Sequence, residues 1–243
     1  DKCPSCGSQV EKEFNNKNKK YDAVKRCSSE GYSCEKIAIE KIKHFVSKDA
    51  LNIDGFGKKV VEKFWEKKFI RFPQDIFKLD YNKIKELDGW GQLSVNNLKY
   101  SINKSKNITL SKFIFSLGIR HIGQENAKIL ASFFGSIKEF TKLLDYKNRE
   151  KILTHLVDLD GIGDTQIQSI NNFFTKEINT RIIKNLIKEL KIQNYSIQNT
   201  GGKFSNKKLM FTGGFQNMSR SEAKSIAENN GGNVLGSISK KLD

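Results

Sequence analysis

The stretch NIDGFGKKVVEKF, residues 52–64, places two glycines around a phenylalanine, with an aspartate before them and two lysines after them. The apolar residues that follow, Val60, Val61 and Phe64, have the spacing of one face of a helix. The stretch therefore predicts a tight glycine turn that leads directly into a basic amphipathic helix.

The same pattern occurs four times, at intervals of roughly thirty to forty residues, as expected of a structural repeat. The copies are Asp54-Gly55-Phe56-Gly57, Asp88-Gly89-Trp90-Gly91, Arg120-His121-Ile122-Gly123 and Asp160-Gly161-Ile162-Gly163. In every copy the residues four before, four after and seven after the last glycine are apolar. They are Ile53, Val61 and Phe64; Leu87, Val95 and Leu98; Ile119, Ala127 and Leu130; and Leu159, Ile167 and Ile170. Matched flanks of this kind predict four helix-hairpin-helix motifs rather than four unrelated glycine turns.

A glycine hairpin in front of a helix suits the binding of an anion. Backbone N–H groups at a helix N-terminus attract negative charge, and glycine leaves room for a phosphate to approach them. Such contacts hold the DNA backbone without reading the bases. The residues expected to contact DNA are Gly55, Gly57, Lys58, Lys59, Gly89, Gly91, Arg120, His121, Gly123, Gly161 and Gly163. The alternative is a helical bundle in which the glycines only make tight turns.

The charge of the chain agrees with a phosphate-rich partner. Forty-three basic and 27 acidic residues give a net charge of +16. A coding bias towards Lys, Asn and Ile is the alternative source of this charge. No run of eighteen apolar residues or charged leader occurs, so we expect no membrane segment and a cytoplasmic, nucleoid-associated protein. The chain starts at Asp1 and not at Met, and we expect it to be a piece of a longer polypeptide.

All four cysteines lie within the first 34 residues, as a C-x2-C pair and a C-x6-C pair separated by twenty residues. Four thiolates suit a tetrahedral Zn²⁺ ion and leave no open coordination position, so we expect a structural site. Disulfides are the alternative, but nothing places the chain outside a reducing compartment. The expected zinc ligands are Cys3, Cys6, Cys27 and Cys34.

The last part of the chain has a different pattern. After the polar stretch NYSIQNTGGKFSNKK, the segment KLMFTGGF indicates a short strand that ends in a glycine turn. SRSEAKSIAENN then predicts a helix, with Ser219 as N-cap and Glu222 completing a capping box, and Gly231-Gly232 as its end.

A cysteine knuckle, four helix-hairpin-helix motifs and a strand-glycine-helix unit, in this order, resemble the C-terminal portion of bacterial NAD⁺-dependent DNA ligases. The supporting strings are CPSCGS, HFVSKDALNIDGFG, SLGIRHIG and FTGGF. The tail resembles the start of a BRCT domain, in which Thr212 and Gly213 match the phosphate-binding positions of some relatives. The resemblance implies a multidomain, mainly α protein with a small four-cysteine zinc finger and a truncated α/β BRCT unit. We expect the zinc finger at residues 1–36, the helix-hairpin-helix domain at 37–193, a linker at 194–206 and the partial BRCT unit at 207–243.

The resemblance also implies an activity, the sealing of nicks in duplex DNA during replication and repair, with NAD⁺ and Mg²⁺ as cofactors of the intact ligase. Such ligases carry AMP on the lysine of a K-x-D-G motif. The three Asp-Gly pairs of this chain have Asn52, Glu86 and Asp158 where that lysine would stand. We therefore expect a chain that binds nicked DNA and zinc, needs separate adenylation and oligonucleotide-binding domains, and is inactive alone.

Two other kinds of protein would contain the same motifs and are alternative interpretations of this sequence. A free-standing DNA-binding scaffold would contain both the hairpins and the zinc site. A DNA glycosylase with an iron–sulfur cluster would also join a hairpin to four cysteines, but as one compact group near its C-terminus.

Overall fold

A computed structural model describes residues 1–12, 14–15, 19–29, 31–195, 202–205, 207–215, 218 and 220–235. The chain forms two compact units, Asp1–Tyr195 and Ser196–Asp243. Helices dominate the secondary structure, which confirms the predicted mainly α class. In the part of the chain that the structure describes, no helix has both the length and the apolar character needed to cross a membrane.

The first unit begins with two small antiparallel ladders. Strand β1 (Val10–Glu11) pairs with β4 (Arg26–Cys27), and β2 (Phe14–Asn15) pairs with β3 (Lys20–Tyr21). The segment that follows leads to the buried Cys34, which is the N-cap of helix α1. The cysteine-containing region is therefore joined directly to the first helix of the helical part.

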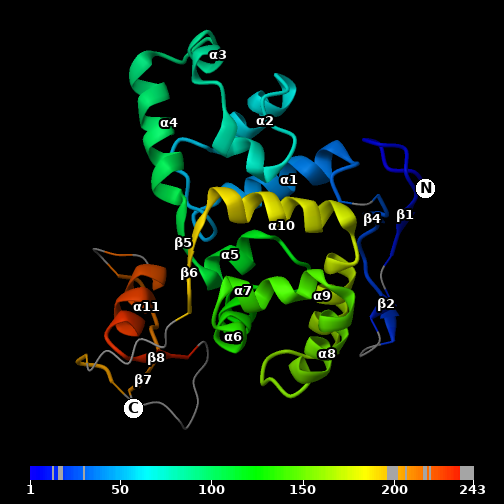
Figure 1. Ribbon diagram of the computed structural model, residues 1–243, viewed down its shortest axis with the longest axis vertical. Coiled ribbons are helices and arrows are strands. Elements are labelled where there is room, and N and C mark those ends of the chain that lie inside the picture. Colours follow the sequence, from blue (N-terminus) through cyan, green and yellow to red (C-terminus); the bar gives the residue numbers. More distant parts are fainter. Residues whose placement is uncertain are drawn as a thin grey trace. The chain divides into compact units, whose positions relative to one another are not determined.

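The helical part contains α1 to α10 and two short 3-10 helices. The bounds are α1 Glu35–Val46, α2 Lys58–Glu66, η1 Pro73–Lys78, α3 Tyr81–Lys85, α4 Gln92–Ser105, α5 Leu110–Ser116, α6 Gln124–Phe134, α7 Ile137–Phe140, η2 Thr141–Leu144, α8 Tyr146–Leu156, α9 Asp164–Phe174 and α10 Glu177–Glu189. In Figure 1, α10 runs between α1–α4 on one side and α5–α9 on the other. Strand β5 (Asn107–Thr109) pairs in parallel with β6 (Lys191–Gln193), so the segment after α10 returns to the middle of the helical part.

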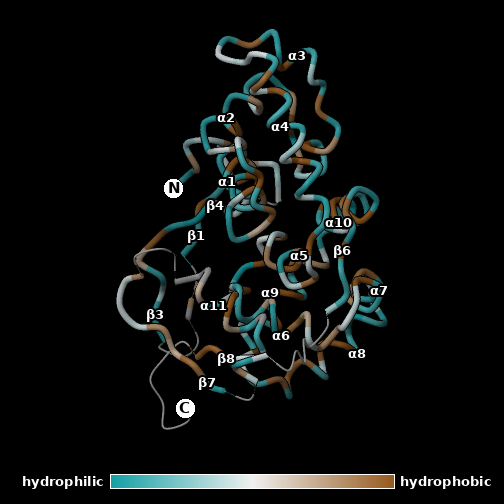
Figure 2. Tube along the Cα trace, turned by 90° about the vertical axis from the view of Figure 1, so that its left-hand side faces the viewer, coloured by the Kyte–Doolittle hydropathy of each residue, from teal (hydrophilic) through white to brown (hydrophobic). Residues whose placement is uncertain are grey.

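The apolar positions of the repeat form much of the core. Nine of the twelve flanking residues are buried, and Leu87, Leu159 and Ile167 pack against the same core while partly exposed. The residues between the hairpin glycines also point inward, with Phe56, Ile122 and Ile162 buried and Trp90 packed against Phe64. Figure 2 shows hydrophobic and hydrophilic stretches alternating along the helices. One side of each hairpin is thus fixed by the core, and its glycines lie at the surface.

The second unit is a small β-α-β arrangement. Strand β7 (Lys208–Leu209) pairs in parallel with β8 (Asn233–Val234), and α11 (Arg220–Asn229) connects them, with Ala223 and Ala227 buried. The predicted helix is confirmed and ends before Gly231, whose φ is +84°. The proposed N-cap, Ser219, lies outside the described residues.

Candidate functional site

The four hairpins share one backbone geometry. In each, the N–H of the residue between the two glycine positions donates to the carbonyl oxygen of the residue three before it, over 3.0 or 3.1 Å. The pairs are Phe56–Ile53, Trp90–Leu87, Ile122–Ile119 and Ile162–Leu159. The next residue is then the N-cap of a helix: Gly57 for α2, Gly91 for α4, Gly123 for α6 and Gly163 for α9. The repeat seen in the sequence is therefore a repeat of structure.

The two glycine positions of a hairpin serve different purposes. The first has a left-handed backbone in every copy, with φ of +80° at Gly55 and +59° at His121. Glycine adopts this conformation without strain, whereas His121 adopts it despite its Cβ. The second position is extended, with φ of −68° at Gly57, which is a conformation open to any residue. The backbone conformation therefore accounts for glycine at the first position, whereas it does not require glycine at the second.

The first two hairpins contact each other through their helices. Lys63 on α2 donates to the carbonyl oxygen of Asp88 in the second hairpin, over 2.9 Å. A Cβ placed on Gly55 in the first hairpin would lie 3.9 Å from Leu98 on α4. Each helix of this pair therefore lies against the turn of the other hairpin.

The last two hairpins repeat this arrangement. Asn126 on α6 donates to the carbonyl oxygen of Gly161 over 2.7 Å, and its Oδ1 accepts from the N–H of Gly123 over 3.3 Å. In the opposite direction, Nδ1 of His121 lies 3.0 Å from the hydroxyl of Ser169 on α9. The four hairpins therefore form two reciprocal pairs.

The N-termini of α2 and α4 have no side-chain cap from the residues that the structure describes, a property that they share with α1 and α10. Side chains cap α3, α5, α7 and α8, the capping residues being Asp80, Thr109, Ser136 and Asp145. No side chain caps α2 at Gly57 or α4 at Gly91 among the described residues, and a Cβ on either glycine would meet nothing within 4 Å. Both helix ends therefore present N–H groups towards open space, where an external anion can accept from them.

The residues expected to contact DNA are all exposed. Their charges are uneven, because Lys58 and Lys59 occupy the first two positions of α2 whereas Glu125 and Asp164 lie in the first turns of α6 and α9. The first hairpin thus has the most positive environment.

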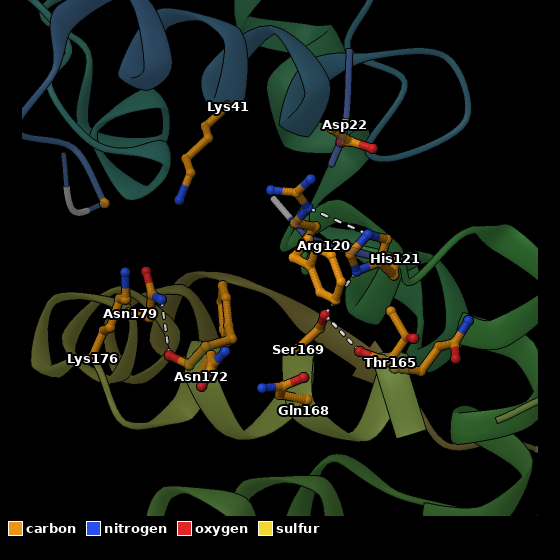
Figure 3. Close-up of a pocket in the computed structure, with 15 residues that line it drawn as sticks. Asp22, Lys41, Arg120, His121, Thr165, Gln168, Ser169, Asn172, Lys176 and Asn179 are labelled. Carbon is orange, nitrogen blue, oxygen red and sulfur yellow. Dashed lines mark hydrogen bonds between the residues drawn. The ribbon is translucent and has the colours of Figure 1, made fainter. Parts of the chain in front are cut away.

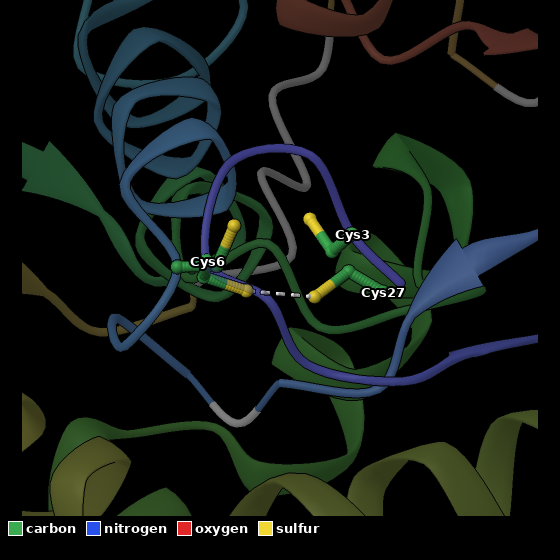
Figure 4. Close-up of side chains that lie close together, drawn as sticks. Cys3, Cys6 and Cys27 are labelled. Carbon is green, nitrogen blue, oxygen red and sulfur yellow. Dashed lines mark hydrogen bonds between the residues drawn. The ribbon is translucent and has the colours of Figure 1, made fainter. Parts of the chain in front are cut away.

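The four cysteines converge at the N-terminal end of the first unit. Their sulfur atoms all lie within 4.8 Å of one another, although the two pairs are far apart in sequence. Figure 4 shows Cys3, Cys6 and Cys27, with 3.4 Å between the sulfurs of Cys6 and Cys27. Gly7, at φ +74°, closes the knuckle by donating to the carbonyl of Cys3 over 2.9 Å. All four cysteines are free thiols, so the alternative of disulfides does not describe this structure.

The chemistry of this cluster fits a metal ion. Four sulfurs at about 2.3 Å from a tetrahedral Zn²⁺ lie about 3.8 Å apart, which agrees with the spacing here. Hydrogen bonds from the hydroxyl and the N–H of Ser8 lower the pKa of the Cys6 thiol to about 6. Burial raises the pKa of the Cys27 thiol to about 12. The thiolate form of Cys6 is therefore already favoured near neutral pH. A bound cation would favour deprotonation of the other three thiols as well.

Sequence reasoning missed the side chains that join the hairpins. Lys63 and Ser169 occupy the same position, six residues after the last glycine, but the other copies have Asn97 and Ile129 there. Because this position has no common chemistry, alignment of the copies gives no signal for it.

Two families match parts of the chain. Residues 112–183 match the family described as helix-hairpin-helix motif, and residues 199–243 match the BRCA1 C Terminus (BRCT) domain. Among curated proteins, a DNA ligase of Pelagibacter ubique is 55% identical over 242 residues, which are 100% of this chain and 35% of that protein. DNA ligases of Rickettsia bellii and Parvibaculum lavamentivorans are 40% and 36% identical over 99% and 100% of the chain, again across 35% of their length.

The chain thus spans about a third of the length of the curated relatives that it matches. Over that span, the similarity and the two family matches identify it as a C-terminal portion of a DNA ligase.

Proposed function

We propose that this portion of a DNA ligase is the part that binds nicked duplex DNA in an NAD⁺-dependent enzyme. Similarity to DNA ligases along almost the whole of this chain favours this function over that of an iron–sulfur glycosylase. Sealing of single-strand nicks in replication and repair is then the activity of the whole polypeptide, and this chain contributes its hold on the DNA backbone.

The proposal rests mainly on the presence of glycine at the second position of the first two hairpins, where the fold does not require it. Gly57 and Gly91 have extended backbones and empty space where a Cβ would be, so the fold does not require glycine at either position. A glycine that the fold does not need is explained if a partner approaches the backbone there. The uncapped helix N-terminus behind it favours an anion, and a DNA phosphate has the right charge and size.

The other hairpin residues extend this contact. Lys58 and Lys59 supply charge beside Gly57, and Arg120 supplies it beside the third hairpin. Because all these groups recognise phosphates, the binding is expected to be similar for every base sequence. Backbone contacts of this kind position a protein on a duplex but do not select a site on it.

We further propose that Cys3, Cys6, Cys27 and Cys34 hold one Zn²⁺ ion. Bound to four thiolates, the ion would have no open position for a substrate, so it would stabilise the fold of residues 1–36. Cys34 is the N-cap of α1, and the metal would therefore fix the N-terminal region against the first helix of the hairpin domain.

The chemical step would depend on other domains of the ligase. The chain has no K-x-D-G lysine, so NAD⁺ and Mg²⁺ would act in an adenylation domain, and an oligonucleotide-binding domain would complete the hold on DNA.

We assign residues 37–193 to the hairpin domain, 194–206 to a linker and 207–243 to part of a BRCT unit. We place the protein in the bacterial cytoplasm, at the nucleoid.

The decisive experiment compares Gly57→Val and Gly91→Val with Gly214→Val in binding to nicked duplexes of several sequences. The Cβ of a valine at Gly57 or Gly91 would have no protein atom within 4 Å, but the side chain would occupy the space that a phosphate oxygen needs. Each hairpin variant should bind about tenfold more weakly, because charge-assisted hydrogen bonds to the phosphate are lost. Gly214 also faces open space and lies outside the hairpins, so Gly214→Val should bind like the wild type.

The melting temperature of each variant serves as the folding control. Folded hairpin variants with unchanged affinity would show that these glycines only make turns. A wild-type chain without measurable affinity for nicked duplex would overturn the proposed function.

A further inference from the structure

A small β-ribbon lies inside the cysteine-containing region. Strands β2 and β3 form a two-stranded sheet of their own, in a register that places Phe14 opposite Tyr21. The two rings contact each other edge to face, with 5.0 Å between their centroids. In the sequence the ribbon falls between Cys6 and Cys27, so a metal ion held by the cysteines would fix the segments that lead into it and out of it.

The aromatic pair of this ribbon is exposed to solvent. Phe14 is 46% and Tyr21 67% exposed, and neither residue belongs to the hydrophobic core of the first unit. A two-stranded ribbon without a packed face is only marginally stable in water. The two rings therefore offer adjacent apolar surface that the fold does not use, and aromatic surface of this kind is typical of binding sites.

The ribbon lies beside the third hairpin. Phe14 on β2 and Asp22, the residue after β3, line one polar pocket of about 680 Å³ together with Arg120 and His121. Figure 3 shows Asp22 directly above these two hairpin residues. Because Arg120 and His121 are among the residues expected to contact DNA, a duplex bound at this hairpin would pass close to the ribbon.

The charged residues around the ribbon also suit DNA. Lys12 and Lys19 are exposed cations next to its two strands. Glu11 is an exposed carboxylate on the adjoining strand, whereas the carboxylate of Asp22 accepts from the guanidinium of Arg26 over 2.6 Å, so its charge is compensated. Lysines around exposed aromatic rings are a combination found in nucleic-acid-binding surfaces, because the cations attract phosphates and the rings pack against the nucleosides.

We infer that the β2–β3 ribbon is a further DNA-contacting element, in which Phe14 and Tyr21 pack against the sugars of a groove beside the third hairpin. A two-stranded ribbon is narrow enough to enter a DNA groove, and apolar side chains are used there against the walls and the base steps. This contact is apolar, and it differs in this from the phosphate contacts of the hairpins. The inference rests on the proposed function and adds a second kind of contact to it.

The first arm of the test measures binding of the zinc-loaded chain to nicked duplexes over a range of salt concentrations. Phe14→Ala and Tyr21→Ala should each bind about fivefold more weakly, because less apolar surface is buried in the complex. The slope of log affinity against log salt should stay that of the wild type, because neither side chain is charged. The matched control is Tyr100→Ala, which removes a tyrosine of similar exposure from α4, outside the hairpins, and should bind like the wild type.

Phe14→Leu and Tyr21→Phe preserve apolar surface and should restore most of the affinity, while the melting temperature of each variant serves as the folding control. A less steep slope in Phe14→Ala would show that phosphate contacts were lost instead of an apolar contact, and would overturn the inference. Unchanged affinity in folded Phe14→Ala and Tyr21→Ala proteins would overturn it as well, and would leave the aromatic pair to a protein surface.

The second arm detects the contact directly. Tyr21→Trp places a fluorophore on the ribbon, and Tyr100→Trp places one on α4. After subtraction of the wild-type signal, which comes from Trp65 and Trp90, nicked duplex should change the emission of the Tyr21→Trp protein and not that of the Tyr100→Trp protein. Unchanged emission of Tyr21→Trp in a protein that binds DNA would overturn only this inference, whereas a wild type that binds no duplex would overturn the proposed function and this inference with it.

Discussion

The side-chain amide of Asn126 donates to the carbonyl oxygen of Gly161 over 2.7 Å, which joins the helix after the third hairpin to the turn of the fourth. The same side chain accepts from the N–H of Gly123, so one residue connects two hairpins. Lys63 makes the corresponding contact from α2 to the second hairpin. Two hairpins held in this way keep a fixed separation, which is what binding to a regular phosphate backbone requires.

Asn126→Ala should therefore lower the free energy of unfolding by about 1 kcal/mol, because two hydrogen bonds to the backbone are lost. Urea denaturation of the zinc-loaded chain measures this change. Asn97→Ala, at an exposed position on α4, is the matched control and should have little effect. Equal stability of the Asn126 variant and the wild type would mean that this contact does not hold the pair together.

The cysteine cluster should bind one Zn²⁺ ion per chain in protein purified without chelators. Four free thiols with sulfurs within 4.8 Å of one another are the basis of this prediction. Cys6→Ser should abolish stoichiometric zinc and unfold the N-terminal region, while most of the helical circular dichroism signal remains. Elemental analysis that finds iron, or no metal, in the wild type would contradict it.

Incubation with NAD⁺ or ATP should leave the mass of the chain unchanged, because no Asp-Gly pair has a lysine two residues before it. Intact-mass spectrometry measures this directly, with a ligase that contains the K-x-D-G lysine as positive control. A stable gain of one AMP on this chain would reveal a nucleotidyl-transfer site outside that motif.

The hairpins and the cysteine cluster were predictable from the sequence for a physical reason. Helix period, glycine placement and thiol spacing are local patterns, and the burial of Val61, Phe64 and Leu98 follows from them. The stretch EKIAIEKIKHFV, which forms α1 (Glu35–Val46), likewise has its apolar residues at the three- and four-residue spacing of a helix.

Contacts between distant segments had no such local signal. Nε2 of His44 lies 2.8 Å from the carbonyl oxygen of Phe115. Lys41 and Lys176 line the same pocket although more than a hundred residues of sequence separate them. Neither pair repeats or has a characteristic spacing, because each depends on how α1 packs against later helices. Contacts of this kind are therefore visible only in the folded chain.

The last prediction concerns the salt dependence of DNA binding. If each hairpin engages one or two phosphates, about four to eight are bound, and log affinity should fall against log salt with a slope of about −4 to −7. Lys58→Ala and Lys59→Ala should each make the slope less steep by up to about one, because these residues lie beside the open end of α2.

Lys67→Ala is the matched control, since Lys67 is exposed at the opposite end of the same helix, about 13 Å away by the rise of an α-helix. It removes the same charge and should leave the slope unchanged. If Lys67→Ala changed the slope as much as Lys58→Ala, the salt dependence would reflect only the net charge of +16, and the hairpin would not be its origin. A larger change for Lys58→Ala than for Lys67→Ala is the result expected if the phosphates lie at the glycine end of this helix.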